Sequence, residues 1–196
     1  MKIGIYVGSF NPVHKGHIKI VNYLLDNNIL DKIIIIATGN YWNKQDLIDI
    51  NRRISMLKKY ENDKIIIDTK YNNLKYTYMV MSHIKKDYPD DTLYLVLGAD
   101  NIINFDKWMN YKELLTYNLI ILNRNNIDIK YYLDKLNKKN NYIICNNLPN
   151  INISSSEIRT NIINKDYKKL SSLLDKKIID YILKYRFSYY KEIHRG

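Results

Sequence analysis

The sequence predicts an α/β protein with a Rossmann-like, doubly wound parallel sheet and a helical C-terminal cap. Two observations carry this prediction: short β-branched runs alternate with amphipathic stretches over most of the chain, and the last fifth has only helical patterns. Strands that alternate with helices need crossover connections, which favour a parallel sheet covered on both faces. The six expected strands are residues 2–7, 32–38, 64–68, 92–97, 118–122 and 142–145.

Helical spacing of apolar residues fills the stretches between these strands and continues after the last of them. The helices expected between strands are residues 16–26, 46–60, 76–87 and 128–140, and those expected in the C-terminal cap are 154–164, 167–174 and 176–184. No repeat or Gly/Ser-rich linker interrupts the pattern. A length of 196 residues suits one domain with an ordinary core. We therefore expect a single domain over residues 1–196.

Charge and composition narrow the function without deciding it. The formal net charge of +11 and the pI near 9.4 favour anionic ligands, but the excess comes largely from lysines scattered along the chain. The single cysteine, Cys145, lies in an apolar run and has no Cys or His at metal-ligand spacing. The chain opens without a secretory signal pattern and has no apolar run of membrane-spanning length. These features predict a cytoplasmic protein that does not enter membranes.

The first motif follows the first expected strand and reads Gly-Ser-Phe-Asn-Pro-Val-His-Lys-Gly-His over residues 8–17. Gly8 allows a ligand to approach the backbone, and Gly16 allows a helix to begin tightly so that its free amide groups face the ligand. His14 and His17 stand three residues apart at that helix start. Two imidazoles in this position can reach one anion, which suits phosphoryl transfer.

The second motif lies about 140 residues further along the chain and opens another expected helix. It contains Ser154, Ser155, Ser156, Glu157 and Arg159. Ser154 with Glu157 has the spacing of a capping box, and that structural role is sufficient to explain both residues. The free amides, the serine hydroxyls and the arginine one turn later also form a pattern that binds anions.

Together the motifs resemble the GxFxPxHxGH and ISSTxxR signatures of the nucleotidyltransferase superfamily. This resemblance implies that His14, His17 and Arg159 are catalytic residues that bind the triphosphate and its developing charge. It also implies that ATP contacts Gly8, Ser9, Phe10, Gly16, Ser154, Ser155 and Ser156. The sequence departs from the first signature at Val7 and Asn11, and Ser156 replaces the usual threonine.

The middle of the chain is similar to the GADN…F…W…EL block of bacterial nicotinate-nucleotide adenylyltransferases. The matching residues are the run 98–101, then Phe105, Trp108 and the pair 113–114. The similarity implies that Gly98 and Asp100 contact the nucleotide. It also implies that Trp108, Tyr76 and Thr77 frame the pyridine ring and that Lys44 and Arg124 help to bind phosphates. Met79 and Met109 depart from the family pattern, so the preference for nicotinate over nicotinamide stays open.

The function expected from these resemblances is transfer of the adenylyl group of ATP to nicotinate mononucleotide, which yields deamido-NAD and pyrophosphate. Mg²⁺ would arrive with ATP, because the carboxylates show no metal-ligand spacing that would define a separate metal site. Nicotinamide mononucleotide and phosphopantetheine are the alternative acceptors. A basic nucleic-acid-binding module is the alternative of another class, but the 19 tyrosines are not interleaved with basic residues as an RNA reader needs. We therefore expect no nucleic-acid partner, and the sequence leaves a homo-oligomer open.

Overall fold

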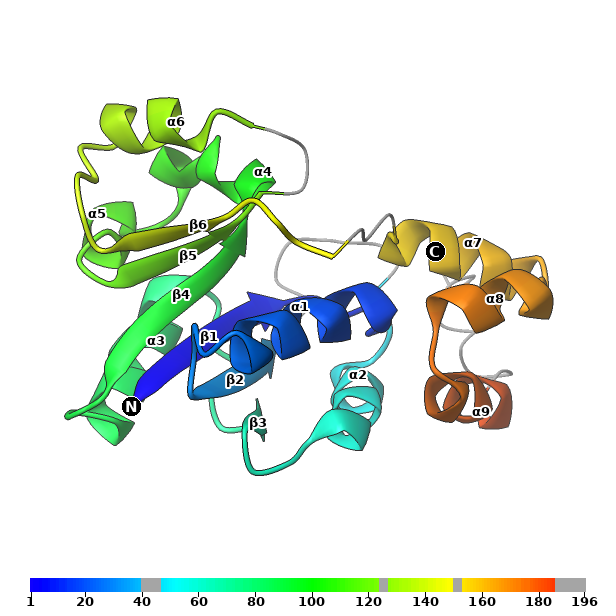
Figure 1. The fold of residues 1–196 in the computed structure, drawn as a ribbon. Coiled ribbons are helices and arrows are strands. Elements are labelled where there is room, and N and C mark those ends of the chain that lie inside the picture. The colour runs from blue at the N-terminus through cyan, green and yellow to red at the C-terminus, as the bar shows by residue number, and fades with distance from the viewer. Residues whose placement is uncertain (40–46, 124–126, 150–152, 186–196) are drawn as a thin grey trace.

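A single parallel sheet of six strands organises the protein (Figure 1). The computed structural model describes residues 1–39, 47–123, 127–149 and 153–185. The six strands predicted from the sequence are confirmed to within one residue at each end. Their bounds are β1 Lys2–Gly8, β2 Lys32–Ala37, β3 Ile65–Asp68, β4 Thr92–Gly98, β5 Asn118–Leu122 and β6 Tyr142–Cys145.

The strand order is β3-β2-β1-β4-β5-β6, and every neighbouring pair is parallel. The chain moves outward from β1 to β3, returns to the centre with β4 and then continues outward on the other side. Ile5 of β1 pairs with Ile34 of β2 on one side and with Leu95 of β4 on the other. The sheet therefore changes direction between β1 and β4, and a ligand crevice is expected outside the carboxyl ends of these two strands.

Each strand sends alternate side chains to two separate cores. Ile33 and Ile35 of β2 belong to the core on one face, whereas Ile34 and Ile36 belong to the core on the other. The first face is covered by α1 (Lys15–Asp26), α2 (Ile50–Leu57) and the C-terminal helices. The second face is covered by α3 (Thr77–Asp87), α6 (Ile129–Lys135) and the short elements that follow β4. This is the doubly wound arrangement that the sequence predicts.

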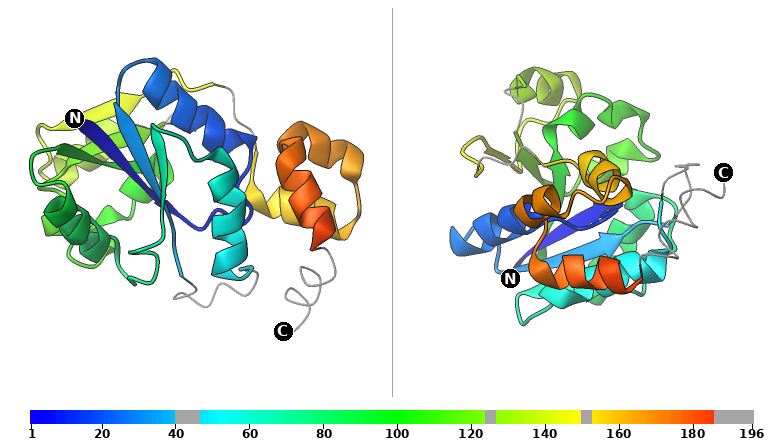
Figure 2. Two further views of the ribbon diagram at one scale, coloured as in Figure 1. Left: turned by 90° about the horizontal axis from the view of Figure 1, so that it is seen from below. Right: turned by 90° about the vertical axis from the view of Figure 1, so that its right-hand side faces the viewer.

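The C-terminal cap consists of α7 (Ser155–Ile163), α8 (Tyr167–Leu173) and α9 (Lys176–Lys184), grouped at one end of the sheet (Figure 2). Polar contacts attach the cap to the rest of the molecule. The Tyr60 hydroxyl, in the 3-10 turn η1 (Lys58–Tyr60), donates to Asp175 at 2.6 Å. The Lys15 ammonium of α1 donates to the Ser171 carbonyl at 2.8 Å. Residues 153–185 thus form the predicted helical cap, and the structure shows that this cap packs on α1 and η1.

Two helices are shorter than the sequence predicts. The helix expected over 46–60 begins only at Ile50, because Asp49 caps it by accepting from the Asn51 amide at 2.9 Å. The helix expected over 128–140 ends at Lys135, because Asn137 adopts a left-handed backbone with φ of 56°. The Lys138 ammonium then turns inward and donates to the carbonyls of Leu115 and Tyr117 at 2.7 and 2.9 Å.

Three short elements between β4 and β5 were not predicted from the sequence. They are α4 (Ala99–Ile102), the 3-10 turn η2 (Phe105–Lys107) and α5 (Tyr111–Leu114). None spans more than four residues, which is too short to show a helical period. They matter for function because α4 carries Asp100 and η2 ends immediately before Trp108.

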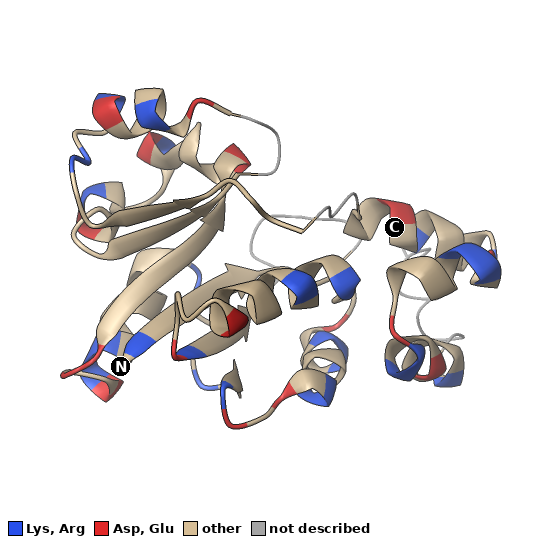
Figure 3. Cartoon of the chain, in the orientation of Figure 1, with Lys and Arg blue, Asp and Glu red and all other residues tan. Residues whose placement is uncertain are grey.

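Basic residues are distributed over the helices and alternate with acidic ones, whereas the strands are almost free of charge (Figure 3). Within the ranges that the structure describes, no helix is long and apolar enough to cross a membrane.

Candidate active site

A cavity of about 570 Å³ lies where the sheet changes direction. Val7 and Gly8 at the end of β1 and Leu97 and Gly98 at the end of β4 form its floor. The predicted site residues that line this cavity are Gly8, Ser9, Phe10, His17, Tyr76, Thr77, Gly98, Asp100 and Trp108. One space therefore joins the first motif to the residues predicted to frame a pyridine ring.

The loop between β1 and α1 follows the floor of the cavity. A β-carbon at Gly8 would lie 3.1 Å from the Phe10 ring, so a larger residue would displace that ring. Phe10 is buried and has a φ of 45°, a left-handed conformation that is unfavourable for a bulky residue. The Asn11–Pro12 peptide bond that follows is cis. A left-handed backbone at a residue such as Phe10 is found where surrounding contacts hold a loop in a functional shape.

His14 and His17 cap the start of α1 by binding each other's backbone. The His17 amide donates to Nδ1 of His14 at 3.4 Å, and the His14 amide donates to Nδ1 of His17 at 3.3 Å. The two rings are stacked, with centroids 3.7 Å apart. His14 is 2% exposed, whereas His17 lines the cavity. Gly16 is buried within the same first helical turn.

This geometry assigns the protons on both imidazoles. Because each Nδ1 accepts a hydrogen bond, the proton of each neutral ring is on Nε2, an assignment that follows from the hydrogen-bond pattern. Protonation of either Nδ1 would break a capping bond and place a cation against the second ring. The hydrogen-bond pattern thus orients Nε2 as the donor nitrogen of each ring.

The second motif packs directly against the β1–α1 loop. Arg159 of α7 donates to the Asn11 carbonyl at 3.1 Å, and the Ser155 hydroxyl donates to the Pro12 carbonyl at 3.3 Å. Arg159 also donates to the Ser156 hydroxyl at 3.2 Å. The structure therefore brings Arg159 and Ser155 to the segment that leads into His14, although neither lines the cavity itself.

Ser154 caps α7, but the predicted capping box is not formed. The Ser154 hydroxyl accepts from the Glu157 amide at 3.1 Å, which is half of that motif. The Glu157 carboxylate instead forms an ion pair with Lys169 of α8 at 3.1 Å. Glu157 therefore holds the C-terminal cap together, and the reciprocal box occurs at His14 and His17, where it was not predicted.

The opposite wall of the cavity comes from the start of α3 and from the segment after β4. Tyr76 precedes α3 and Thr77 is its first residue, so the amino-terminal end of this helix lies at the cavity wall. Trp108 is partly buried and packs on Phe105, with ring centroids 5.2 Å apart. A β-carbon at Gly98 would collide with the Asp100 carboxylate, so a larger residue there would force that side chain to move. The predicted ring-binding residues thus face one space.

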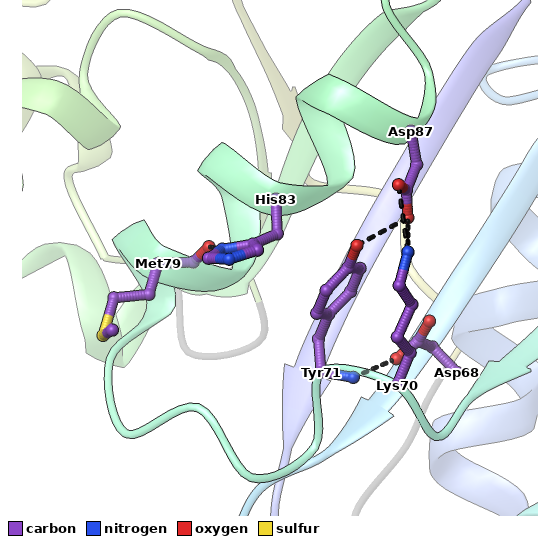
Figure 4. A network of polar contacts seen from close by, with 6 residues as sticks. All are labelled: Asp68, Lys70, Tyr71, Met79, His83 and Asp87. Carbon is purple, nitrogen blue, oxygen red and sulfur yellow. Dashed lines mark hydrogen bonds and ion pairs between the residues drawn. The ribbon is translucent and has the colours of Figure 1, made fainter.

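A polar network holds the segment that leads into α3 (Figure 4). The Tyr71 hydroxyl and the Lys70 ammonium both donate to Asp87 near the end of α3, at 2.7 and 3.0 Å. The hydrogen bond from Tyr71, followed by that from Lys70, keeps the pKa of the Asp87 carboxyl below its usual range. An ionised Asp87 therefore fixes the connection that positions Tyr76 and Thr77.

Lys75 and Lys107 also line the cavity, although they were not predicted from the sequence. Each directly precedes a predicted ring-binding residue, and that adjacency is the only sequence signal that could have identified them. Of the departures from the family pattern, Val7 and Met109 line the cavity, whereas Met79 does not. Lys44 and Arg124 lie outside the described residues, so the structure does not place them.

Comparison with known proteins shows the family to which the chain belongs. The Cytidylyltransferase-like family model matches residues 5–161. A relative from Fusobacterium nucleatum is 37% identical over 195 residues, covering 92% of this chain and 100% of its own length. One from Borreliella afzelii is 38% identical over 175 residues, covering 84% of this chain and 86% of its own. Both bear the name "Probable nicotinate-nucleotide adenylyltransferase".

A solved structure supports the same assignment. The nicotinic acid mononucleotide adenylyltransferase of Plasmodium falciparum, complexed with NaAD, aligns with a TM-score of 0.75 and 26% identity. The alignment covers 94% of this chain and 95% of that chain. Because relatives above 30% identity match over most of their length, this chain belongs to the nicotinate-nucleotide adenylyltransferase family.

Proposed function

We propose that this protein transfers the adenylyl group of ATP to nicotinate mononucleotide, forming deamido-NAD and pyrophosphate. The 5′-phosphate of the mononucleotide would attack the α-phosphorus of ATP in line as pyrophosphate leaves. The observation that carries the proposal is the contact between the two motifs: Arg159 and Ser155 bind the loop that leads to His14 and His17. We further propose that residues 1–196 act as one unit in the cytoplasm.

On the phosphate side, the protein supplies donors and positioning. The attacking phosphate is already ionised at neutral pH, so the reaction needs no general base. His17 can donate from Nε2 into the cavity, with His14 stacked behind it and Arg159 adding a permanent cation. We assign Gly8, Ser9, Phe10, Gly16 and Ser154 to Ser156 to ATP binding, together with Lys44 and Arg124 outside the described residues.

The metal that suits this site is Mg²⁺ bound to the phosphates of ATP. Among the described residues, Asp100 is the one carboxylate that lines the cavity, and no group of three metal-ligating side chains occurs. Mg²⁺ commonly uses one or two carboxylates plus substrate phosphates, so this donor set fits a metal that enters with the nucleotide. When bound, the ion would neutralise charge on the triphosphate oxygens.

On the acceptor side, we propose that Trp108, Tyr76 and Thr77 bind the pyridine ring and that the carboxylate of nicotinate lies near the start of α3. The amide groups at the start of that helix can donate hydrogen bonds to an anion. Lys75 and Lys107 add positive charge to the same wall. A carboxylate gains from this charge and a neutral carboxamide does not, so we expect nicotinate to be preferred.

The test is a pyrophosphate-release assay with ATP and Mg²⁺, run in parallel with nicotinate mononucleotide, nicotinamide mononucleotide and phosphopantetheine. We expect the highest kcat/KM with nicotinate mononucleotide. A higher value with either alternative acceptor would overturn the acceptor assignment. If no acceptor supports pyrophosphate release and the protein binds RNA in a salt-resistant way, the proposed enzyme activity would be wrong and a nucleic-acid-binding function would take its place.

Reversing the charge of Lys107 should reduce the preference for nicotinate. Exposed charges contribute about 0.2–1 kcal/mol each, so the charge reversal Lys107→Glu, worth about 0.4–2 kcal/mol, should lower the nicotinate-to-nicotinamide ratio of kcat/KM by roughly twofold to thirtyfold. The change should shrink as salt is added. Lys112→Glu alters the net charge equally at an exposed site outside the cavity lining and is the matched control. Equal ratios in both variants would show that Lys107 does not select the acceptor.

A further inference from the structure

Arg53 of α2 is the largest fully buried side chain among the described residues, with 1% of its surface exposed. Its guanidinium donates to three backbone carbonyls: Ser9 at 2.7 Å, Thr38 at 2.8 Å and Ile48 at 2.9 Å. These carbonyls belong to three separate segments, namely the β1–α1 loop, the end of β2 and the approach to α2. One side chain therefore joins three segments around the active site.

Burying the Arg53 guanidinium costs desolvation free energy. Its contacts do not offset this cost in the usual way. Buried charges are normally paired with an opposite charge, whereas the recorded acceptors of Arg53 are all neutral carbonyls. Burial lowers the pKa of the guanidinium, and Asp49 opposes this effect from a distance. An apolar residue would fill the same space without the desolvation cost. The position therefore demands the planar, five-donor group that only arginine offers.

The location of two of the three carbonyls points to what the arginine does. Ser9 and Thr38 both line the cavity. In a planar trans peptide the C=O and the next N–H point in opposite directions, so holding the Ser9 carbonyl fixes the direction of the Phe10 amide. Phe10 is the residue with the unfavourable φ of 45°. Arg53 thus holds the loop in a shape that Phe10 would not adopt by itself.

The Ile48 carbonyl, the third acceptor, connects Arg53 to the first motif. Ile48 is held on both sides, because its carbonyl accepts from Arg53 and its amide donates to the Asn11 side chain at 3.2 Å. The Asn11 carbonyl in turn accepts from Arg159. Arg53 and Arg159 are therefore linked through Ile48 and Asn11, and each holds a different stretch of the β1–α1 loop.

We propose that Arg53 is a positioning residue for adenylyl transfer: it fixes the β1–α1 loop and the end of β2 around the triphosphate without touching the substrates. This inference rests on the proposed function, in which that loop binds ATP. A small misplacement of groups that bind a transferring phosphoryl unit can reduce a rate by about 10²-fold. Loss of the arginine should therefore act mainly on kcat and on the KM for ATP.

The test compares Arg53→Lys with Met56→Ala. The lysine keeps the charge but cannot bind three carbonyls in fixed directions, and Met56 is a fully buried residue of the same helix that contacts none of these carbonyls. Both variants should have a lower Tm. At a temperature where both stay folded, we expect Arg53→Lys to lose about 10- to 100-fold in kcat/KM for ATP, with the KM for the mononucleotide within about twofold of wild type. Met56→Ala should keep near-normal kinetics.

Other outcomes have defined meanings. Equal kinetics in the two variants, or an Arg53→Lys protein that is unfolded even with ATP at 10 °C, would assign Arg53 to stability alone and overturn the proposal. A chemical-rescue arm adds a second readout: low millimolar guanidinium should restore part of the kcat of Arg53→Ala and none of that of Met56→Ala. Absence of activity in the wild type itself would instead remove the proposed function, so the two failures are distinguishable.

Discussion

Replacing His17 with alanine is expected to lower kcat by about 10²- to 10³-fold, the usual loss when one preorganised donor to a developing oxyanion is removed. His17 is the imidazole that lines the cavity, and we propose Nε2 as its donor because Nδ1 accepts a hydrogen bond from the His14 amide. The same substitution removes half of the reciprocal cap of α1, which should cost about 1 kcal/mol of stability. Initial rates of pyrophosphate release and a thermal unfolding curve measure the two effects separately.

His83→Ala is the matched control for this experiment. His83 is a partly buried histidine on α3 that binds the Met79 carbonyl and does not line the cavity. It should show a comparable loss of stability with a rate close to wild type. A His17→Ala protein that retains most of its rate would remove this imidazole from the mechanism.

The second large effect is expected at Arg159. Arg159→Ala should lower kcat/KM for ATP by about 10²-fold or more, because it removes a charge-assisted donor and also frees the Asn11 carbonyl of the β1–α1 loop. Arg159→Lys keeps the charge but loses the planar fork, so it should recover only part of the rate. Steady-state kinetics with ATP as the varied substrate measure both changes.

Thr160→Ala provides the control for Arg159. Thr160 is the next residue of α7, is exposed and binds only the Ser156 carbonyl of its own helix. Its removal should leave kcat/KM unchanged. If Arg159→Ala matched this control, α7 would serve the fold and not the triphosphate.

The strands could be predicted from the sequence because buried parallel strands form continuous apolar runs. The order of those strands in the sheet could not be predicted. It depends on the side of the preceding strand on which each crossover places the next one, and no single segment of the sequence determines that choice. The predicted helix ends were wrong where a single residue determines the end of the helix. Asn137 ends α6 through a left-handed backbone, and asparagine adopts that conformation only in some contexts.

The candidate site likewise contains features that could be predicted from the sequence and features that could not. Short motifs identified Gly8, His17 and Trp108, and the structure places all three around one cavity. The cap formed by His14 and His17 escaped prediction, because capping rules favour serine, threonine, aspartate and asparagine. Lys107 and Arg53 escaped because their relevance comes from residues far away in the sequence.

The change of direction between β1 and β4 also divides the elements of the proposed site between the two cores of the protein. The elements predicted to hold the triphosphate, α1 and α7, pack on one core, whereas α3 and η2 at the acceptor end pack on the other. Mutations in one core therefore have little direct contact with the other. In evolutionary terms, a descendant could acquire a new acceptor by altering α3 and η2 while it inherited the ATP machinery intact, which is how one scaffold can diversify into enzymes that share a donor.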